Sequence, residues 1–203
     1  MIGLIDYNMG NLQSVVNAFG RIGVEIKIVK KAEEIGDFEK IILPGVGAFK
    51  DAMECLDKGG MSEAVKSFAS SGKPLLGICL GMQLLFDNSV EFGKSAGLGL
   101  IEGEVVKFDI SRFEHKLKVP HMGWNELFVQ KESPLFKGMN EAFYLYFVHS
   151  FHATCEEKYI IGKTIYGYEF PSAVQKGNIF GFQPHPEKSH DNGLKILKNF
   201  VEL

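Results

Sequence analysis

The sequence is poor in cysteine and has no long apolar run, and both shortages limit what the protein can be. Its three cysteines, Cys55, Cys79 and Cys155, are too few and too scattered for a disulfide framework or a zinc site. No stretch approaches the roughly 20 consecutive apolar residues of a membrane-spanning helix. With no leader-like segment ahead of the first strand-like run, we expect a reducing, cytoplasmic location, where a free thiol can act as a nucleophile.

An excess of charge of one sign is missing as well. The formal net charge of −3 gives no electrostatic reason to expect binding to nucleic acid or to an anionic membrane. Hydrophobic residues make up 45% and charged residues 23% of the chain, which is an ordinary globular composition. No repeat, low-complexity tract or linker is visible, so we expect residues 1–203 to form a single domain.

The first half of the chain alternates short apolar runs with amphipathic stretches. Apolar residues at helical spacing between Asn11 and Gly23 predict a helix, flanked by strand-like runs at Met1–Asp6 and Val24–Val29. Further strands are predicted near residues 40–43 and 74–78, with two helices between them. This alternation is typical of an α/β fold whose mainly parallel sheet is covered by helices on both faces.

The second half of the chain has a different pattern of glycines and apolar runs. A glycine-rich segment at 93–103 is followed by short apolar runs that predict antiparallel strands and hairpins, and a terminal helix is expected at 191–201. The predicted strands lie at residues 105–108, 143–148, 163–168 and 179–183. We therefore expect antiparallel strands to be added to a parallel core.

One cysteine stands in a frame of glycines, Gly77-Ile78-Cys79-Leu80-Gly81, where an apolar strand is followed by a helical pattern. This G-x-C-x-G frame matches the nucleophile elbow, with sulfur in place of oxygen. Glycine is needed on both sides because flanking side chains would collide with neighbouring backbone. The turn pushes the thiol clear of the sheet, at a helix N-terminus that favours thiolate. The alternative is a buried structural cysteine beside two unrelated glycines.

A nucleophilic thiol needs a base, and one of the six histidines has an unusual setting. His185 lies between two prolines, which hold its backbone rigidly at the end of a predicted strand, and Glu187 is close enough to orient the imidazole. Cys79, His185 and Glu187 together predict a Cys-His-Glu catalytic triad. The other histidines fit surface or core positions, with His149 and His121 as the alternative bases.

The loop Pro44-Gly45-Val46-Gly47 connects a predicted strand to the next helix and can supply backbone donors. Its glycines permit unusual backbone angles and let a ligand approach the N–H groups closely, as an oxyanion hole requires. The N–H of Leu80, just after the cysteine, is the expected second donor. A plain glycine turn is the simpler alternative, whereas a phosphate loop is disfavoured because no Walker lysine or GxGxxG spacing follows.

Six segments of the chain resemble class I, triad-type glutamine amidotransferases, and among these the glutaminase subunits of imidazole glycerol phosphate synthase. They are spread over essentially the whole sequence and read DYNMGNLQSV, LPGVGAF, GICLGMQLLF, KVPHMGWN, YFVHSF and PHPEKS. The elbow alone identifies the superfamily, while PHMGWN and DYxMGN point to this subunit. The resemblance implies a flavodoxin-like fold, with a mainly parallel central sheet, flanking helices and added antiparallel strands.

The resemblance implies a glutaminase mechanism and the residues that carry it. Cys79 would attack the side-chain amide of L-glutamine to give a glutamyl thioester and ammonia, with His185 moving the proton and Glu187 orienting it. The residues implied in glutamine binding are Gln83, Glu91, Ser150 and Phe151, and the oxyanion segment falls on Gly45, Val46, Gly47 and Leu80. In relatives this segment must rearrange before glutaminase activity appears. No cofactor and no metal are implied.

The resemblance also implies a heterodimer with a separate (β/α)8-barrel cyclase. Ammonia would pass through the barrel to give imidazole glycerol phosphate and an aminoimidazole carboxamide nucleotide (AICAR), in histidine biosynthesis. This chain is too short to contain a barrel as well as a glutaminase. The positions that meet the barrel in the family are Asn11, Met122, Trp124 and Lys188. For Trp124, a core aromatic is the alternative to an interface anchor.

Three departures from the family pattern leave other functions open. Asn8 stands where glycine is usual, Pro184 where an aromatic residue is usual, and His190 where glutamine or serine is usual. Together with residues 166–170, they also fit paralogous glutaminase subunits that supply ammonia for surface-sugar amidation. Less favoured are an inactive regulatory subunit, against which the complete triad argues, and a free-standing PfpI-like cysteine hydrolase, a group that lacks the counterparts of Gln83 and of the terminal H-P-E.

Overall fold

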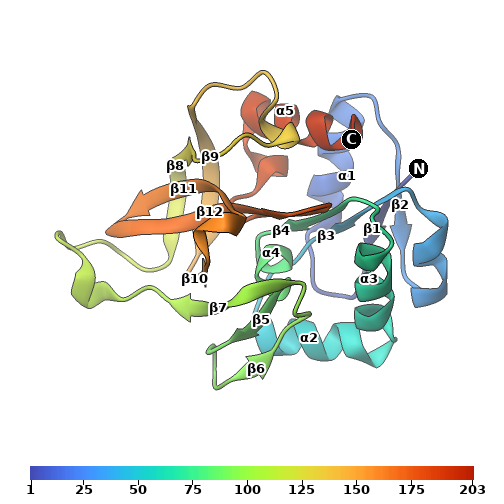
Figure 1. Cartoon of the computed structure of the whole chain (residues 1–203), viewed down its shortest axis with the longest axis horizontal. Helices are drawn as coiled ribbons and strands as arrows, with labels where there is room; N and C mark the ends of the chain where they lie inside the picture. Colours follow the sequence, from blue (N-terminus) through green and yellow to red (C-terminus); the bar gives the residue numbers. More distant parts are fainter.

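Nine strands form the larger sheet of the computed structural model, which describes residues 1–203 (Figure 1). Their order is β2-β1-β3-β4-β13-β12-β11-β8-β9. The five strands from β2 to β13 run parallel, and the pairs from β13 to β9 are antiparallel. The strands are β1 (Ile2–Ile5), β2 (Ile26–Val29), β3 (Lys40–Leu43), β4 (Leu75–Ile78), β8 (His121–Val129), β9 (Ala142–His149), β11 (Ile160–Tyr166), β12 (Tyr168–Lys176) and β13 (Ile179–Phe182).

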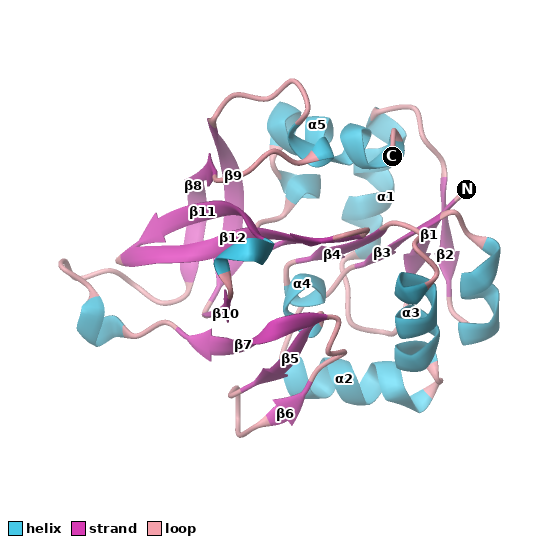
Figure 2. Ribbon diagram, viewed as in Figure 1, coloured by secondary structure: helices cyan, strands magenta, loops and turns pink.

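A second, four-stranded sheet has the order β10-β7-β5-β6. Its strands are β5 (Phe86–Ser89), β6 (Ser95–Ala96), β7 (Ile101–Lys107) and β10 (Phe151–Cys155). β5 and β7 are parallel, and the other two pairs are antiparallel. In Figure 2 this sheet lies below the larger one, next to α2 and α4.

Five α-helices and five short 3₁₀ helices complete the chain. The α-helices are α1 (Leu12–Arg21), α2 (Phe49–Lys58), α3 (Met61–Ser70), α4 (Leu80–Leu84) and α5 (His190–Val201). The 3₁₀ helices are η1 (Ala32–Asp37), η2 (Ile110–Arg112), η3 (Pro134–Phe136), η4 (Glu157–Tyr159) and η5 (Pro186–Lys188). No helix combines the length and the apolar character needed to cross a membrane.

Two apolar clusters, one on each face of the larger sheet, form the core. α1 and α5 pack in one cluster, and α2, α3 and α4 pack in the other. Along β3 the side chains alternate, because Ile41 and Leu43 belong to the cluster with α2 and Ile42 to the cluster with α1. A strand buried on both faces must be apolar throughout, and this explains the short continuous apolar runs of the first half of the chain. The predicted α/β architecture is confirmed.

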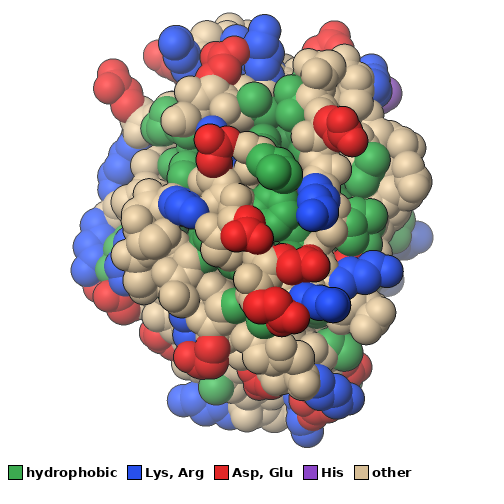
Figure 3. Space-filling view, turned by 90° about the vertical axis from the view of Figure 1, so that its right-hand side faces the viewer, with side chains coloured by type: hydrophobic (Ala, Val, Ile, Leu, Met, Phe, Trp, Pro, Cys, Tyr) green, Lys and Arg blue, Asp and Glu red, His purple; other side chains and the backbone are tan.

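Charged side chains of both signs are mixed on the face near the β2 edge (Figure 3). No large region of a single sign is visible there, and the small net charge of −3 is consistent with that view. This face therefore offers no electrostatic docking site for a polyanion.

Two details of the predicted architecture need correction. An antiparallel strand is expected at 179–183, but β13 pairs parallel with β4, with Ile179 opposite Leu75, and antiparallel only with β12. The helical pattern after Cys79 yields only the five-residue α4, after which the chain enters β5. Periodicity does not reveal which neighbour a short apolar strand will have, because pairing is decided by contacts distant in sequence.

The elbow glycines are required by close backbone approach. A Cβ atom on Gly81 would lie 1.8 Å from the carbonyl oxygen of Leu43, and one on Gly77 would lie 2.8 Å from the carbonyl oxygen of Gly81. Such distances are far below van der Waals contact, so α4 can begin directly behind Cys79 only with glycine at both positions.

We therefore expect Gly81→Ala to lower the free energy of unfolding by about 3 kcal/mol or more, since the clash is with backbone. Gly20→Ala is the matched control, because Gly20 lies in α1 and a Cβ atom added there would meet nothing within 4 Å. The control should be neutral or stabilised by up to about 1 kcal/mol. Urea denaturation measures both, and equal effects of the two changes would contradict this account of the elbow.

Candidate active site

The carboxyl ends of four adjacent parallel strands meet at one edge of the larger sheet. β1, β3, β4 and β13 are consecutive in that sheet, and their carboxyl ends lead into the segment Asp6–Gly10, the loop Pro44–Gly47, Cys79 and the segment that contains His185. Ligands of open α/β sheets bind at such an edge. Residues distant in sequence are thereby brought together.

Cys79 occupies a strained turn between β4 and α4. Its φ is 55° and its ψ is −112°, a conformation that non-glycine residues rarely adopt. The turn is held by the Cys79 N–H, which donates to the carbonyl oxygen of Phe182 at 2.7 Å. Sγ lies 4.0 Å from the carbonyl oxygen of Val148 and 3.8 Å from Nε2 of Gln183. The predicted elbow therefore has the backbone strain that a nucleophile turn requires.

His185 and Glu187 form a buried pair. Nδ1 of His185 lies 2.7 Å from Oε1 of Glu187, and each side chain is 3% exposed. The backbone N–H of His185 donates to the carbonyl oxygen of Tyr146 at 2.9 Å, which fixes the residue next to β9. Nε2 of His185 has no hydrogen-bond partner within the protein. Because Nδ1 is held by the carboxylate, Nε2 is the ring atom left for chemistry.

The charge state of His185 is set by opposing influences. Burial lowers its pKa, but the negative charge at Cys79 and the hydrogen-bonded carboxylate of Glu187 outweigh burial and raise the pKa to about 10. At neutral pH the imidazole therefore carries a proton beside the sulfur. A protonated imidazole is the form that can donate a proton to a leaving amine.

A cavity of about 380 Å³ contains the sulfur and the imidazole. Its walls are Val46, Gly47, Cys79, Leu80, Gln83, Glu91, Val148, His149, Ser150, Phe151 and His185. All four residues predicted to bind glutamine line this cavity, as do Cys79 and His185. Glu187 lies behind His185, and Gly45 is absent from the wall because it packs against Tyr7 and Leu80.

The predicted oxyanion segment has its central N–H engaged elsewhere. The N–H of Val46 donates to the carbonyl oxygen of Met9 at 3.3 Å. The hydroxyl of Tyr7 donates to the carbonyl oxygen of Pro44 at 2.7 Å. The next residue, Asn8, which stands where the family usually has glycine, has a positive φ of 67°, an angle that asparagine tolerates. The segment after β1 therefore holds the loop after β3 in a state in which Val46 cannot donate to a ligand.

Three of the predicted interface residues lie near one another in the fold. Met122 is 62% and Trp124 47% exposed on β8, so Trp124 is not a core residue. The Trp124 ring stacks on His190, with centroids 5.1 Å apart, and Lys188 lies two residues before His190 without an ion-pair partner. Asn11, the fourth, is the exposed N-cap residue of α1.

The two histidines that are alternative bases by sequence belong to a separate hydrogen-bonded chain. Nδ1 of His149 donates to the carbonyl oxygen of Phe151 at 2.7 Å, so Nε2 of its neutral ring accepts from Nδ1 of His121 at 2.9 Å. Nε2 of His121 in turn accepts from Asn125. Burial lowers the pKa of both rings, that of His121 to about 4. Both histidines are therefore neutral and hydrogen-bonded at both ring nitrogens, and His149 lines the cavity.

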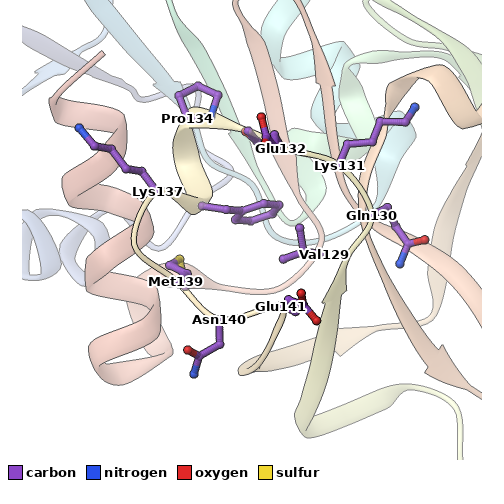
Figure 4. A pocket seen from close by; sticks show the side chains of 11 residues that line it. Val129, Gln130, Lys131, Glu132, Pro134, Lys137, Met139, Asn140 and Glu141 are labelled. Carbon is purple, nitrogen blue, oxygen red and sulfur yellow. The ribbon is translucent and has the colours of Figure 1, made fainter.

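A larger hollow, of about 1010 Å³, lies away from the thiol (Figure 4). The chain between β8 and β9 forms its rim, where Lys131, Glu132, Lys137 and Glu141 are mixed. No cysteine or histidine lines it. It therefore contains neither the thiol nor the imidazole of the predicted triad, and the smaller cavity is the candidate active site.

Sequence reasoning missed two residues next to the predicted site. Gln183 precedes the Pro-His-Pro segment, and its side chain contacts the sulfur. Tyr7 precedes Asn8, and its hydroxyl holds the loop after β3. Tyr7 lies within the segment DYNMGNLQSV and Gln183 directly precedes the segment PHPEKS, but no spacing rule links either position to Cys79.

Comparison with known proteins agrees with these features. The profile of the family described as "Glutamine amidotransferase class-I" matches residues 3–203. The chain is 64% identical over 203 residues to "Imidazole glycerol phosphate synthase subunit HisH" of Sulfurimonas denitrificans, covering 100% of this chain and 98% of that protein. It is 57% identical over 204 residues to the protein of the same name from Wolinella succinogenes, with both chains covered completely.

Solved structures resemble the fold over its whole length. A "Crystal structure of glutamine amidotransferase" matches with a TM-score of 0.77 at 20% identity, covering 99% of this chain and 97% of that one. The "Structure of PurLQS from Thermotoga maritima" matches with a TM-score of 0.77 at 21% identity and the same coverage. At such identity the likeness concerns the fold alone.

The neutral histidine pair predicts a loss of stability in acid. A histidine in the unfolded chain titrates near pH 6.5, whereas the folded-state pKa of His121 is about 4. Between these values the unfolded chain binds more protons, so the free energy of unfolding falls as pH falls. We expect the stability advantage of the wild type over His121→Gln to shrink through this window in urea titrations.

The matched control for this experiment is His115→Gln, which removes an exposed imidazole from the loop before β8. A stability difference between wild type and His121→Gln that stays constant from pH 6.5 to about 4 would contradict the neutral assignment.

Proposed function

Because the chain belongs to the class I glutamine amidotransferase family, we propose that it is the glutaminase subunit of an imidazole glycerol phosphate synthase. The observation that carries the proposal is the placement of Cys79 and the His185–Glu187 pair at one cavity. The names of the two bacterial relatives support the assignment to that synthase and to histidine biosynthesis. In this assignment the substrate is L-glutamine and the products are glutamate and ammonia.

The first half of the proposed reaction forms a thioester. The Cys79 thiolate attacks the side-chain carbonyl carbon of glutamine, and a C–S bond forms as the carbonyl oxygen becomes an oxyanion. The imidazolium of His185 donates its Nε2 proton to the amide nitrogen, the C–N bond breaks, and ammonia leaves. The raised pKa of His185 supports this order, because the proton is already on the ring before attack.

The second half hydrolyses the thioester. Nε2 of His185 takes a proton from water, and the water oxygen attacks the thioester carbonyl. The C–S bond then breaks, glutamate leaves, and the sulfur returns to the thiolate beside a protonated imidazole. Glu187 keeps Nδ1 protonated throughout and orients the ring. Glutamine and water are thereby converted to glutamate and ammonia.

The oxyanion needs backbone donors, and we propose that one of them is supplied only after the Pro44–Gly47 loop rearranges. The Leu80 N–H, at the start of α4, is one donor. The N–H of Val46 is bonded to the Met9 carbonyl oxygen, so it must change partner to serve as the second. Gly47, with φ at 101°, gives the loop the conformational freedom for that change. The isolated chain is thus a nearly idle glutaminase.

A partner that favours the rearranged loop would activate the enzyme, and the exposed face of β8 is where we place the cyclase barrel. Met122, Trp124 and Phe128 alternate with inward residues on this strand and are 62%, 47% and 37% exposed. Tyr144 on β9 is 54% exposed. A run of apolar side chains left open on a sheet face is typical of a protein–protein interface.

The triad predicts a graded loss of glutamine hydrolysis. Cys79→Ala should lower the rate by several powers of ten, because no nucleophile remains, while ammonia-dependent synthesis with the cyclase partner is kept. His185→Asn should be nearly as damaging, and Glu187→Gln less so, because the carboxylate only orients the ring. Cys155→Ala is the control, since burial and the nearby Glu157 raise the pKa of this thiol to about 12.

Steady-state glutamate release measures these variants. Substantial glutamine hydrolysis by Cys79→Ala, or equal and small losses in the His185 and Glu187 variants, would place the reaction elsewhere.

The engaged Val46 N–H predicts strong activation by a partner. Addition of a cyclase barrel subunit with its nucleotide ligand should raise glutamate release by about a thousandfold, which corresponds to roughly 4 kcal/mol of preference for the rearranged loop. Lys188→Glu should abolish this activation and leave the folded chain intact, because Lys188 follows the triad and has no internal ion pair.

The matched charge reversal is Lys31→Glu, at the exposed N-terminus of η1 and away from β8. Full activity of the purified chain without any partner would refute the proposal that the isolated chain is a nearly idle glutaminase. Equal effects of the two reversals would refute the placement of the partner next to Lys188.

A further inference from the structure

Two buried glutamine side chains lie behind the thiol, and one of them, Gln183, has no part in the reaction described above. Gln183 follows β13 directly and is fully buried, at 0% exposed. Its Nε2 lies 3.8 Å from Cys79 Sγ, and its Oε1 lies 2.9 Å from Nε2 of Gln83. Nε2 of Gln83 also lies 3.1 Å from the carbonyl oxygen of Phe151.

The direction of each of these hydrogen bonds follows from one backbone atom. The carbonyl oxygen of Phe151 can only accept, so the Gln83 atom beside it must be the nitrogen. The second N–H of Gln83 donates to Gln183, which must therefore present its oxygen. The nitrogen of Gln183 is thereby turned toward the sulfur as a donor. Only one orientation of the two carboxamides satisfies the set.

The same orientation determines what Gln83 presents to the cavity. Both of its N–H groups are used inside the protein, so only Oε1 remains for a ligand. Glu91 lines the same cavity with a carboxylate. Two acceptors on one wall fit a cationic group such as the α-ammonium of an amino acid, and a turned carboxamide would present N–H donors that repel it.

We propose that Gln183 is a further catalytic residue, which donates a hydrogen bond to the Cys79 thiolate and locks Gln83 with its oxygen facing the cavity. The first role concerns the thiol alone, whereas the second rests on the proposed function. The sulfur is negative before it attacks glutamine and again when the thioester C–S bond breaks. A donor fixed in a buried site stabilises that charge without reorganisation.

The expected size of the rate effect follows from the energy of a hydrogen bond to a charged sulfur. A hydrogen bond to a charged group contributes enough to change a rate by about tenfold to a hundredfold. Loss of the Gln183 donor should therefore lower the fraction of Cys79 present as thiolate, and with it the rate of modification near neutral pH, by about tenfold or more. The lock on Gln83 acts separately, through recognition of the amino-acid part of the substrate.

Two substitutions separate the two roles. Gln183→Leu removes both roles with little change in volume. Gln183→Glu keeps an oxygen that accepts from Gln83 and puts a second oxygen in place of the N–H group that faces the sulfur. Gln175→Leu is the matched control, because Gln175 is a half-buried glutamine on neighbouring β12 that donates only to the Gly177 carbonyl oxygen.

The full-length chain is treated with iodoacetamide, which has no amino-acid part, and with a glutamine-like chloroketone, which has one. Mass spectrometry follows modification of Cys79 between about pH 5 and pH 10. With iodoacetamide, both Gln183 variants should need a pH about one unit higher for the same rate. With the chloroketone, the rate of Cys79 modification in Gln183→Leu should fall by about a further tenfold. In Gln183→Glu the ratio of the chloroketone rate to the iodoacetamide rate should stay at its wild-type value.

Each outcome decides one point. An iodoacetamide profile of Gln183→Leu that superimposes on those of the wild type and Gln175→Leu overturns the inference. Should Gln183→Leu fail to fold by circular dichroism, an unshifted profile of Gln183→Glu overturns it instead. A wild-type Cys79 that shows no preference for the chloroketone contradicts the proposed function, while the iodoacetamide profiles still decide the donor role.

Discussion

The close approach of α4 to the end of β3 is the constraint on which the site depends. The Gly81 Cα stands so near the Leu43 carbonyl oxygen that an added Cβ would lie 1.8 Å from it. Only in this contact can the helix start directly after Cys79, with φ at 55°. The thiol is then held over the carboxyl ends of the parallel strands, within 4.0 Å of both Val148 and Gln183. A looser junction would move the sulfur away from its partners.

Histidines in one region of the molecule have opposite charge states, and the cause is the group next to each. His185 is buried but faces Cys79 and Glu187, whose negative charges raise its pKa to about 10. His121 and His149 are buried against aromatic rings and each other, so burial lowers the pKa of both. The proton needed for the proposed reaction is thus carried by His185, while His149 in the cavity wall and His121 behind it stay neutral.

Strand β8 connects the cavity wall with the open face of the sheet. Successive side chains of a strand point to opposite sides, so His121 and Asn125 face inward while Met122 and Trp124 are exposed. His121 bonds to His149, which lines the cavity and bonds to the Phe151 carbonyl oxygen. The surface that we propose for the partner and the proposed glutamine pocket are therefore connected through the hydrogen bond between His121 of β8 and His149 of β9.

The sequence by itself determined the α/β class, the elbow at Cys79 and the pairing of His185 with Glu187, because each depends on residues close together in the chain. Glycine spacing and flanking prolines act locally, so they can be recognised without a structure. Tertiary structure alone decided that β13 lies beside β4, that the Val46 N–H is bonded to Met9, and that Gln183 donates to the sulfur. Each of these contacts joins residues that are 37 or more positions apart, or 104 in the case of Gln183 and Cys79, and local propensity carries no information about such distant partners.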